Sequence, residues 1–549
     1  MPPQKGAIPK ARLPGFEEPD PYALSINGQR LSEYLKQMGQ AWVVGLVDLL
    51  LAVDWQRFFP SYKPTGRPPI HPRIIMGLLV YGTLLGRTSL RELEMLASLD
   101  LGAWFVCGGL QPDHSTLGKF LQRHRDILTE DFFAELTTYL VARLKLGPGV
   151  AAVDGSVVAA VSSRLSTLKL EAAREAAKEA ATKASALAKS QVPQDAGTCT
   201  ATPAAPTLPE GDQPAGGTSA PPPAPTAPPS SATPATTKPP ASAALAEAQA
   251  RAAVAAEVVR VAELRASRAK DPKRTAVVPG ELDAVIQPLK NGPSLPAYKP
   301  SIAVHESGLI VGQAVDPSSE IAVVTSLRAQ HRQILGADPV TTLFDAGYHC
   351  LEVLQAFADQ DILCPAGTLG RDFVKRGRGG LFGKASFVYD EHTDSFRCPG
   401  GQTLARMTTK QVDPNGPFAN YRAAAGCCAT CALKARCTKA KARTVSRWDG
   451  DELKDAMAQV MAQPGARTTF KRRAAIVEPV FALLKERQRL RRFRRRGLRN
   501  VRLEFALHCI AFNVGRTLSL ERRRLVVLLF WSRLEGSHWR LVAVGAWLP

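Results

Sequence analysis

Residues 149–155 read GVAAVDG, an apolar run that stops on the carboxylate of Asp154. A second apolar run, VTTLF at 340–344, stops on Asp345 in the same way. Short apolar runs bounded by turn residues are typical of buried strands in an α/β sheet. Because the ligands of such sheets collect beyond the strand ends, the two Asp side chains would approach each other if their strands are neighbours.

The segments around these two strands predict the rest of an α/β core. Two β-rich runs at 301–304 and 309–315 flank the sequence HESG, which indicates a hairpin. A helix is expected at 319–335, a second helix at 351–358 and a short strand at 362–364. This order of elements, completed by a later helix, is that of a mixed RNase H-like sheet flanked by helices, so we predict the α/β class.

Three acidic side chains form the candidate catalytic set: Asp154, Asp345 and Glu478, the last within IVEPVF. Hydrolysis and transesterification of a phosphodiester need an activated oxygen nucleophile and a stabilised leaving oxygen. Two Mg²⁺ ions about 3.5–4 Å apart supply both. Magnesium takes oxygen ligands and keeps several waters, so a few carboxylates suffice. We therefore expect two Mg²⁺ or Mn²⁺ ions at these residues.

Each of the three acids also has a plain structural interpretation. Asp before Gly is common in turns, so Asp154 and Asp345 could simply end their strands. Pro479 disfavours a helical conformation at Glu478 and favours its place at the start of a helix. The two strand ends taken together with the basic segment after Glu478 favour catalysis.

The basic segment after Glu478 predicts contact with phosphate. If its helix continues to residue 496, one face at roughly 100° per residue carries the carboxylate and a row of cations. Lys485 would then lie two turns, about 10.5 Å, from the carboxylate, where it could hold a phosphate. The cations on this face are Lys485, Arg489, Arg492 and Arg496.

The charge of the whole chain indicates a polyanionic partner. It has 70 Lys and Arg against 49 Asp and Glu, a net charge of +21, which attracts phosphate backbones. An anionic membrane surface is the rival partner, but no apolar run approaches the roughly 20 residues of a bilayer span. The basic start of the chain lacks the apolar centre of a secretory signal. The chain is therefore expected to be soluble and intracellular, with a phosphate-bearing polyanion as its partner.

Residues 30–148 predict a helical domain. The run TSLREL at 88–93 begins a helix, with Ser89 as its cap and Glu92 closing a capping box. A second, basic and amphipathic helix begins after Asp113. Short helices joined by tight turns resemble a helix–turn–helix arrangement; a plain helical bundle is the equal alternative. The candidate DNA-binding residues here are His114, Ser115, Lys119 and Arg123.

Changes in composition divide the rest of the chain. Residues 1–29 are expected to be disordered, and 149–164 hold the first strand of the core. An insertion at 165–290 should contain two Ala-rich helices joined by a disordered Pro/Ala/Thr linker at 192–243. The remaining expected parts are the core at 291–365, a Cys-bearing insertion at 366–460, the Glu helix and basic stretch at 461–518, and an apolar tail of unassigned role at 519–549.

Five of the ten cysteines gather in the second insertion, where Cys398 is followed by the spacing Cys427-Cys428-x2-Cys431-x5-Cys437. In a reducing compartment such a cluster favours a metal over disulfides. Four thiolates can hold one tetrahedral Zn²⁺, which would be structural because no position stays open for water. We prefer Cys398, Cys428, Cys431 and Cys437 as ligands. A reduced cluster without metal is the alternative.

These motifs resemble the DDE transposases of bacterial insertion sequences, a group with an RNase H-like catalytic core. PDHST at 112–116 resembles the N-terminal DNA-binding segment of the group. VDGS at 153–156 and DAGYH at 345–349 resemble its first and second catalytic Asp, and VEPVF at 477–481 resembles the catalytic Glu segment.

A related signature of the group places a Tyr and an Arg before the Glu and a Lys seven residues after it. In this chain Lys485 fits, Phe470 stands for the Tyr, and Arg473 lies one position off register.

The resemblance implies metal-dependent cleavage at the ends of a mobile element, followed by transfer of the cut strands into target DNA. It further implies a cytoplasmic, nucleoid-associated protein that binds double-stranded DNA. Joining two ends would require a homo-oligomer on DNA. Two other functions stay open on the sequence. One is a catalytically silent, transposase-derived DNA-binding protein, and the other is a two-metal nuclease without strand transfer.

Overall fold

The computed structural model describes residues 15–63, 65–190, 241–269, 271–272, 275–289, 292–366, 380–413 and 416–534. The chain divides into a larger unit, residues 1–165 with 283–549, and a smaller unit, residues 166–282. Most of the expected linker at 192–243, the first 14 residues and the last 15 lie outside the described residues.

The N-terminal part of the larger unit is built from helices around the buried helix α3. The predicted capping box of α4 is confirmed, because Ser89 and Glu92 satisfy each other's backbone N–H groups. Asp113 caps α6 by accepting a hydrogen bond from the Thr116 N–H at 2.5 Å. The helices are α1 (Leu31–Gln37), α2 (Ala41–Leu51), α3 (Pro72–Leu84), α4 (Leu90–Leu99), α5 (Leu101–Val106), α6 (His114–Arg123) and α7 (Phe132–Arg143).

Residues 15–29 differ from the expectation of disorder. The ring of Phe16 packs 4.6 Å from that of Phe59, and Glu18 accepts a hydrogen bond from the buried Arg73 at 2.8 Å. The strand β1 (Ser25–Ile26) then pairs with β2 (Gln29–Arg30). Composition alone suggested disorder because the aromatic and charged partners of this segment lie far away in the sequence.

A mixed sheet forms the centre of the larger unit. Its order is β11-β10-β3-β8-β4, with β7 and β9 also paired to β8. β10 pairs in parallel with both β3 and β11, whereas β8 pairs antiparallel with both β3 and β9. The strands are β3 (Val150–Gly155), β4 (Val158–Ala159), β7 (Val285–Pro288), β8 (Ser294–His305), β9 (Ile310–Asp316), β10 (Thr341–Leu343) and β11 (Ile362–Leu363). The predicted α/β class is confirmed.

Helices α10 (Val324–Leu335) and α15 (Pro464–Glu486) lie on opposite sides of β3. Val153 lines a small cavity together with Val324 and Leu327 of α10, whereas the next residue, Asp154, contacts α15. Successive side chains of a strand point to opposite faces, so the two helices cover different faces. The helix α11 (Leu351–Ala356) follows β10 in the chain.

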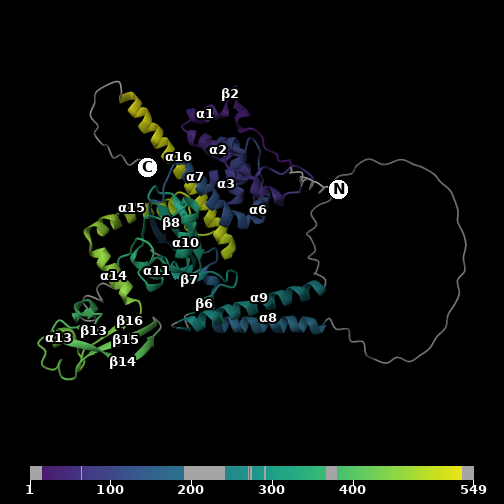
Figure 1. Cartoon of the computed structure of the whole chain (residues 1–549). Coiled ribbons are helices and arrows are strands. Elements are labelled where there is room, and N and C mark those ends of the chain that lie inside the picture. Colours follow the sequence, from purple (N-terminus) through teal and green to yellow (C-terminus); the bar gives the residue numbers. More distant parts are fainter. Residues whose placement is uncertain are drawn as a thin grey trace, which may run out of the picture. The chain divides into compact units, whose positions relative to one another are not determined.

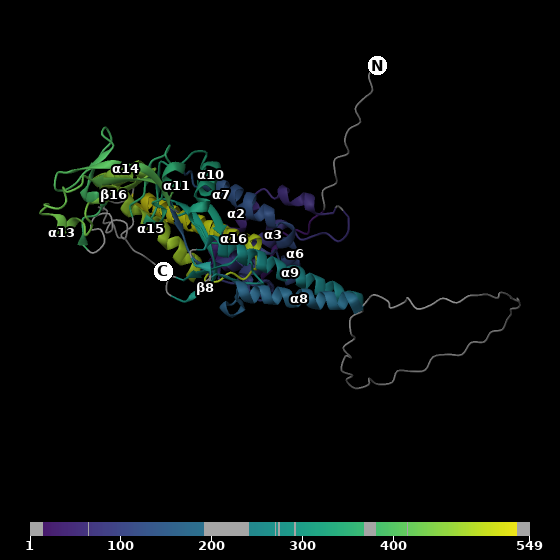
Figure 2. The ribbon, with the colours of Figure 1, turned by 90° about the horizontal axis from the view of Figure 1, so that it is seen from below.

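The long helix α16 (Leu498–Leu534) joins the core to the N-terminal helices. It packs against α3, α7 and β9, and both views show it running beside the N-terminal helices (Figures 1 and 2). The amide of Asn513 fixes it to the sheet by accepting from the Ile310 N–H at 2.8 Å and donating to the Ile310 carbonyl at 2.7 Å. Residues 519–534 continue this helix and do not begin a separate tail.

The Cys-bearing insertion forms an antiparallel sheet with its own small apolar core, which includes Phe396, Leu404 and Tyr421. The strands pair in chain order and are followed by α14, as Figure 1 shows. The elements are β12 (Val388–Asp390), β13 (Ser395–Arg397), β14 (Thr403–Asp413), β15 (Gly416–Ala423), α13 (Lys434–Cys437), β16 (Thr444–Trp448) and α14 (Asp451–Ala462).

The smaller unit is a helical hairpin. The Ala-rich helices α8 (Leu170–Ser190) and α9 (Ala241–Arg268) lie side by side (Figures 1 and 2). Two short strands, β5 (Leu168–Lys169) and β6 (Ala276–Val277), pair at its base. Its core is small, and consists of Ala173, Val258, Ala262 and Val277. No helix in the described parts of either unit is long and apolar enough to cross a bilayer.

Candidate active site

Asp154 and Asp345 lie at the same edge of the sheet, as the sequence predicts. In the parallel pairing of β3 and β10, Thr341 lies opposite Val150 and Leu343 opposite Ala152. The same offset, carried two residues further along both chains, places Asp345 beside Asp154. The strand pairing therefore determines that the two carboxylates meet.

Arg473 joins these two carboxylates. Its Nη2 lies 3.0 Å from Asp154 Oδ1 and 3.8 Å from Asp345 Oδ2, and it also donates to the Val153 carbonyl at 3.0 Å. The side chain is buried and comes from the middle of α15. A positive group thus occupies the position between the two acids, where a divalent cation would find the same oxygen ligands.

The electrostatics of the pair favour binding of a cation. Burial raises the pKa of Asp154, the negative charge of Asp345 raises it further, and Arg473 lowers it. The raised pKa means that the fold disfavours the charged form of Asp154 even with Arg473 beside it. A divalent ion would stabilise both carboxylates at once.

Asp345 also has a local structural role. Its Oδ1 accepts a hydrogen bond from the Gly347 N–H at 2.7 Å, which closes the turn after β10. Its other carboxylate oxygen faces Arg473. One carboxylate oxygen of Asp345 therefore forms the turn, as the structural interpretation of this residue expects. The other oxygen faces the candidate site.

Glu478 is not brought to the two Asp residues by any described contact. It is exposed and forms no ion pair with a residue that the structure describes. The expectation that Pro479 puts it at a helix start is wrong, because α15 continues through that proline. Glu478 precedes Lys485 by two helical turns on the same face. Lys485 donates a hydrogen bond to Ser156 Oγ at 2.5 Å, two residues after Asp154.

The basic face predicted to continue from Lys485 is interrupted. The helix α15 ends at Glu486, and Arg489 adopts a left-handed backbone conformation with φ of 58°. Arg489, Arg492 and Arg496 therefore lie in the loop 487–497 and not on a line with Glu478. All three side chains are exposed. The loop is anchored by the buried Phe493, whose N–H donates to the Ala159 carbonyl at 2.8 Å.

Glu504 of α16 holds the other side of this loop. Its carboxylate accepts hydrogen bonds from the backbone N–H of Arg494 at 2.9 and 3.0 Å and from that of Arg495 at 2.9 Å. Burial raises the pKa of Glu504 from 4.5 to about 7, although these N–H groups and the neighbouring guanidinium groups lower it.

The free energy of unfolding should decrease as the pH rises, because of Glu504. A group whose pKa is higher in the folded state stabilises the fold fully below its unfolded pKa, and this contribution is lost as the pH rises through the folded pKa. We expect ~3 kcal/mol to be lost between about pH 4.5 and 7. Urea unfolding of wild type and Glu504→Gln at several pH values measures it. Equal pH dependence in the two proteins would contradict the prediction.

The exposed face of α6 carries three of its four predicted DNA-binding residues. Ser115, Lys119 and Arg123 are exposed and lie at helical spacing, and Arg123 stacks over the ring of Tyr62 at 4.7 Å. His114 is exposed but its Nδ1 pairs with Glu94 of α4 at 2.8 Å. This pair makes His114 part of the packing between α4 and α6.

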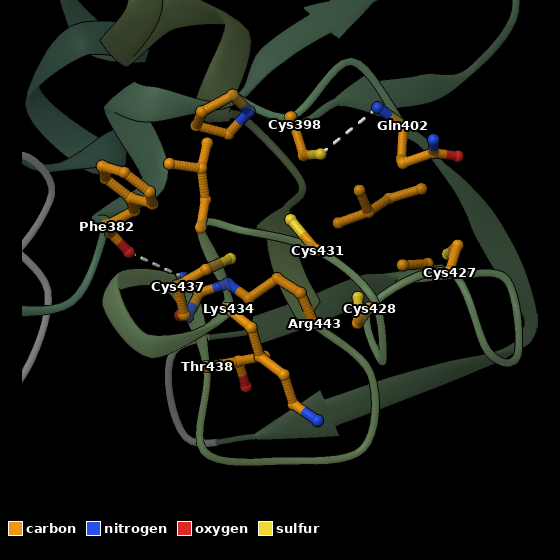
Figure 3. A pocket seen from close by; sticks show the side chains of 15 residues that line it. Phe382, Cys398, Gln402, Cys427, Cys428, Cys431, Lys434, Cys437, Thr438 and Arg443 are labelled. Carbon is orange, nitrogen blue, oxygen red and sulfur yellow. Dashed lines mark hydrogen bonds between the residues drawn. The ribbon is translucent and has the colours of Figure 1, made fainter.

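The five clustered cysteines line one pocket in the Cys-bearing insertion (Figure 3). The Cys398 Sγ accepts a hydrogen bond from the Gln402 N–H at 3.3 Å, whereas Cys427 donates to the Ala424 carbonyl at 2.8 Å. Burial raises the pKa of Cys437. The charges of Cys398, Cys428 and Cys431 raise it further, against Arg443, which lowers it.

A complete set of metal ligands is absent from the part of the chain that the structure describes. No three His, Cys, Asp or Glu side chains there are arranged as a metal-binding group. At the sheet edge two carboxylates face one cationic nitrogen. In the insertion the thiols share a pocket. The thiols of Cys431 and Cys398 both border Gly400: a Cβ atom placed on this glycine would lie 3.4 Å from the Cys431 Sγ and 3.7 Å from the Cys398 Sγ.

Comparison with known protein families identifies two segments. Residues 397–518 match the transposase DDE domain, and residues 45–123 match the transposase domain DUF772. The first segment contains Arg473, Glu478 and Lys485, and the second ends with α6. Searches among curated proteins and among solved structures return no significant match.

Proposed function

This chain belongs to the DDE transposases of insertion sequences, and from that premise we propose that it cuts DNA at the ends of its own element and joins them to a target. The observation that carries the proposal is the pairing of Asp154 and Asp345 through Arg473. Two acids and one cation at a sheet edge fit a phosphodiester and its metal ions better than they fit a structural ion pair.

The strand order supports an RNase H-like core for this reaction. Three antiparallel strands, β9, β8 and β3, are followed by the parallel strands β10 and β11. This arrangement puts the first Asp at the end of the central strand and the second at the end of its neighbour.

We assign the two divalent ions, Mg²⁺ or Mn²⁺, to Asp154 and Asp345, with Glu478 of α15 as the third acid. When bound, the ions would activate the attacking oxygen and stabilise the leaving oxygen. Lys485 keeps α15 at the end of β3 through Ser156, so a shift of that helix would move Glu478 relative to the two Asp residues. Arg473 is a further residue that would contact the scissile phosphate once its two carboxylates bind metal.

The proposed DNA contacts lie on two elements. The exposed cations of α6 would hold one segment of the element end, and the exposed arginines of the loop 487–497 would hold the phosphates beside the cut. Joining two ends requires two copies of the chain, so we expect a homo-oligomer on DNA. The cysteine cluster is assigned one structural Zn²⁺.

The proposal is tested with duplexes that carry the terminal sequences of the element, supercoiled target DNA and Mg²⁺. We expect cleavage at the element end and covalent joining to the target, both abolished by a chelator. Cleavage without joining would establish a nuclease. Binding without cleavage would establish a silent DNA-binding protein, and either result would overturn the proposal.

A further inference from the structure

Glu320 lies at the same sheet edge as the two Asp carboxylates. It directly precedes a short 3₁₀ helix, Ile321–Val323, that leads into α10. A Cβ atom placed on Gly155 would come 2.5 Å from Glu320 Cγ and 2.6 Å from its Cδ. Gly155 follows Asp154 in the chain, so the missing side chain at this position lets the Glu320 carboxyl lie against the end of β3.

Asp154 and Glu320 reach this edge from opposite faces of the sheet. Asp154 pairs with Ile302 of β8, and Gly155 pairs with Ser301. Consecutive positions alternate between faces, so Asp154 points toward Arg473 and α15, while Gly155 faces Glu320. The pairing of β3 with β10 ends at Ala152 and Leu343. On that side of Asp154 and Gly155 no paired strand separates the two faces, so side chains from both faces can approach one ion there.

The buried hydroxyl of Tyr348 is within electrostatic reach of all three acids. Tyr348 is 0% exposed, and its hydroxyl has no hydrogen-bond partner among the described residues. Burial raises the pKa of this hydroxyl, and the charges of Glu320, Asp154 and Asp345, in that order, raise it further. A buried hydroxyl without a partner costs about 1–3 kcal/mol, so it marks a place where the water shell of a bound ion would find a donor.

Lys299 of β8 neutralises Glu320. Its Nζ lies 3.2 Å from Glu320 Oε1, and both side chains are 25% exposed. Glu320 is thus paired with a lysine in the same way that Asp154 and Asp345 are paired with an arginine. Both cations hold positions that a divalent ion would take, on either side of Gly155.

We propose that Glu320 is a fourth acidic residue of the divalent-ion site and that Lys299 competes with the ion for its carboxylate. This inference rests on the proposed function, because it extends the metal site of Asp154 and Asp345. The inference differs from the proposed function in how the acid was found. The assignment of Glu478 as third acid came from sequence, whereas Glu320 is assigned from its place in the fold.

The test is titration of the full chain with Mn²⁺ in the absence of DNA, followed by electron paramagnetic resonance of the free ion. We expect Glu320→Gln to weaken Mn²⁺ binding about 10- to 100-fold. Lys299→Met should bind Mn²⁺ at least as tightly as wild type, because it removes a competing cation. The matched control is Glu33→Gln, which removes an exposed acid near the start of α1.

Three results would overturn the inference or its premise. If Glu320→Gln binds Mn²⁺ like Glu33→Gln, Glu320 is no ligand. If Glu320→Gln and Lys299→Met weaken binding equally, the two residues form only a structural ion pair. If Asp154→Asn leaves Mn²⁺ binding unchanged, the proposed metal site itself is wrong, and Glu320 with it.

Folding of the variants is checked by thermal unfolding without metal. The Lys299–Glu320 pair is partly exposed, and such pairs contribute little to stability, so we expect each variant to unfold near the wild-type temperature. The Mn²⁺ affinity of Glu320→Asp is a second test, because this variant keeps the carboxylate on a side chain that is one methylene shorter. Recovery of part of the affinity lost in Glu320→Gln supports the inference, and no recovery contradicts it.

Discussion

Asp154→Asn should abolish cleavage and strand joining while leaving the fold as stable as that of wild type. Loss of one metal ligand removes the stabilisation of charge on the reacting oxygens. We expect a decrease of about 10³-fold or more in rate, equivalent to ~4 kcal/mol of transition-state stabilisation. Burial raises the pKa of Asp154, so a neutral amide of the same shape should not destabilise the protein. Single-turnover cleavage of end-bearing DNA and thermal unfolding measure the two effects.

The matched control is Asp390→Asn, at another strand end. Asp390 ends β12, and its Oδ1 accepts a hydrogen bond from the His392 N–H at 3.0 Å, so it is a turn-forming Asp without catalytic neighbours. We expect this variant to cleave normally. DNA binding, measured at fixed salt, should be retained in both variants. Normal cleavage by Asp154→Asn would refute the site, and loss of folding in that variant alone would show that Asp154 is a structural residue.

The strands and their acidic ends could be predicted because their signals are local. A short apolar run that stops on Asp needs only its own residues to be recognised. The register of β3 with β10, by contrast, is known only from the structure. The capping box of α4 is local in the same sense, since Ser89 and Glu92 satisfy each other within one helical turn.

The remaining site residues depend on contacts that the sequence does not encode locally. Arg473 is one of many arginines, and only the position of α15 shows that it lies between the two acids. Glu320 stands just before a helix, where an acid is expected for the helix dipole alone. Its contact with Gly155 joins residues far apart in the chain. The end of α15 at Glu486 was missed because Arg489 takes the left-handed conformation that normally marks glycine.

Removal of metal from the cysteine cluster should unfold the Cys-bearing insertion without unfolding the larger core. The sheet β12–β16 has only a small apolar core of its own, so a structural metal would contribute much of its stability. Structural Zn²⁺ in small domains contributes apparent binding free energies of about 10–16 kcal/mol. We expect one zinc per chain as purified. After chelation, backbone amides of β12–β16 should exchange rapidly with solvent while those of β3 and β8 stay protected.

Two cysteine variants distinguish a zinc site from a cluster of reduced thiols without metal. Cys431→Ser should lose the zinc and show the same rapid exchange, because Cys431 shares the pocket with Cys398, Cys428 and Cys437. Cys427→Ser should keep the zinc, since the Cys427 thiol donates to the Ala424 carbonyl and is left out of the proposed ligand set. Elemental analysis and hydrogen exchange measure both. A zinc-free wild type, or the same behaviour in the two variants, would show that packing alone holds this sheet together.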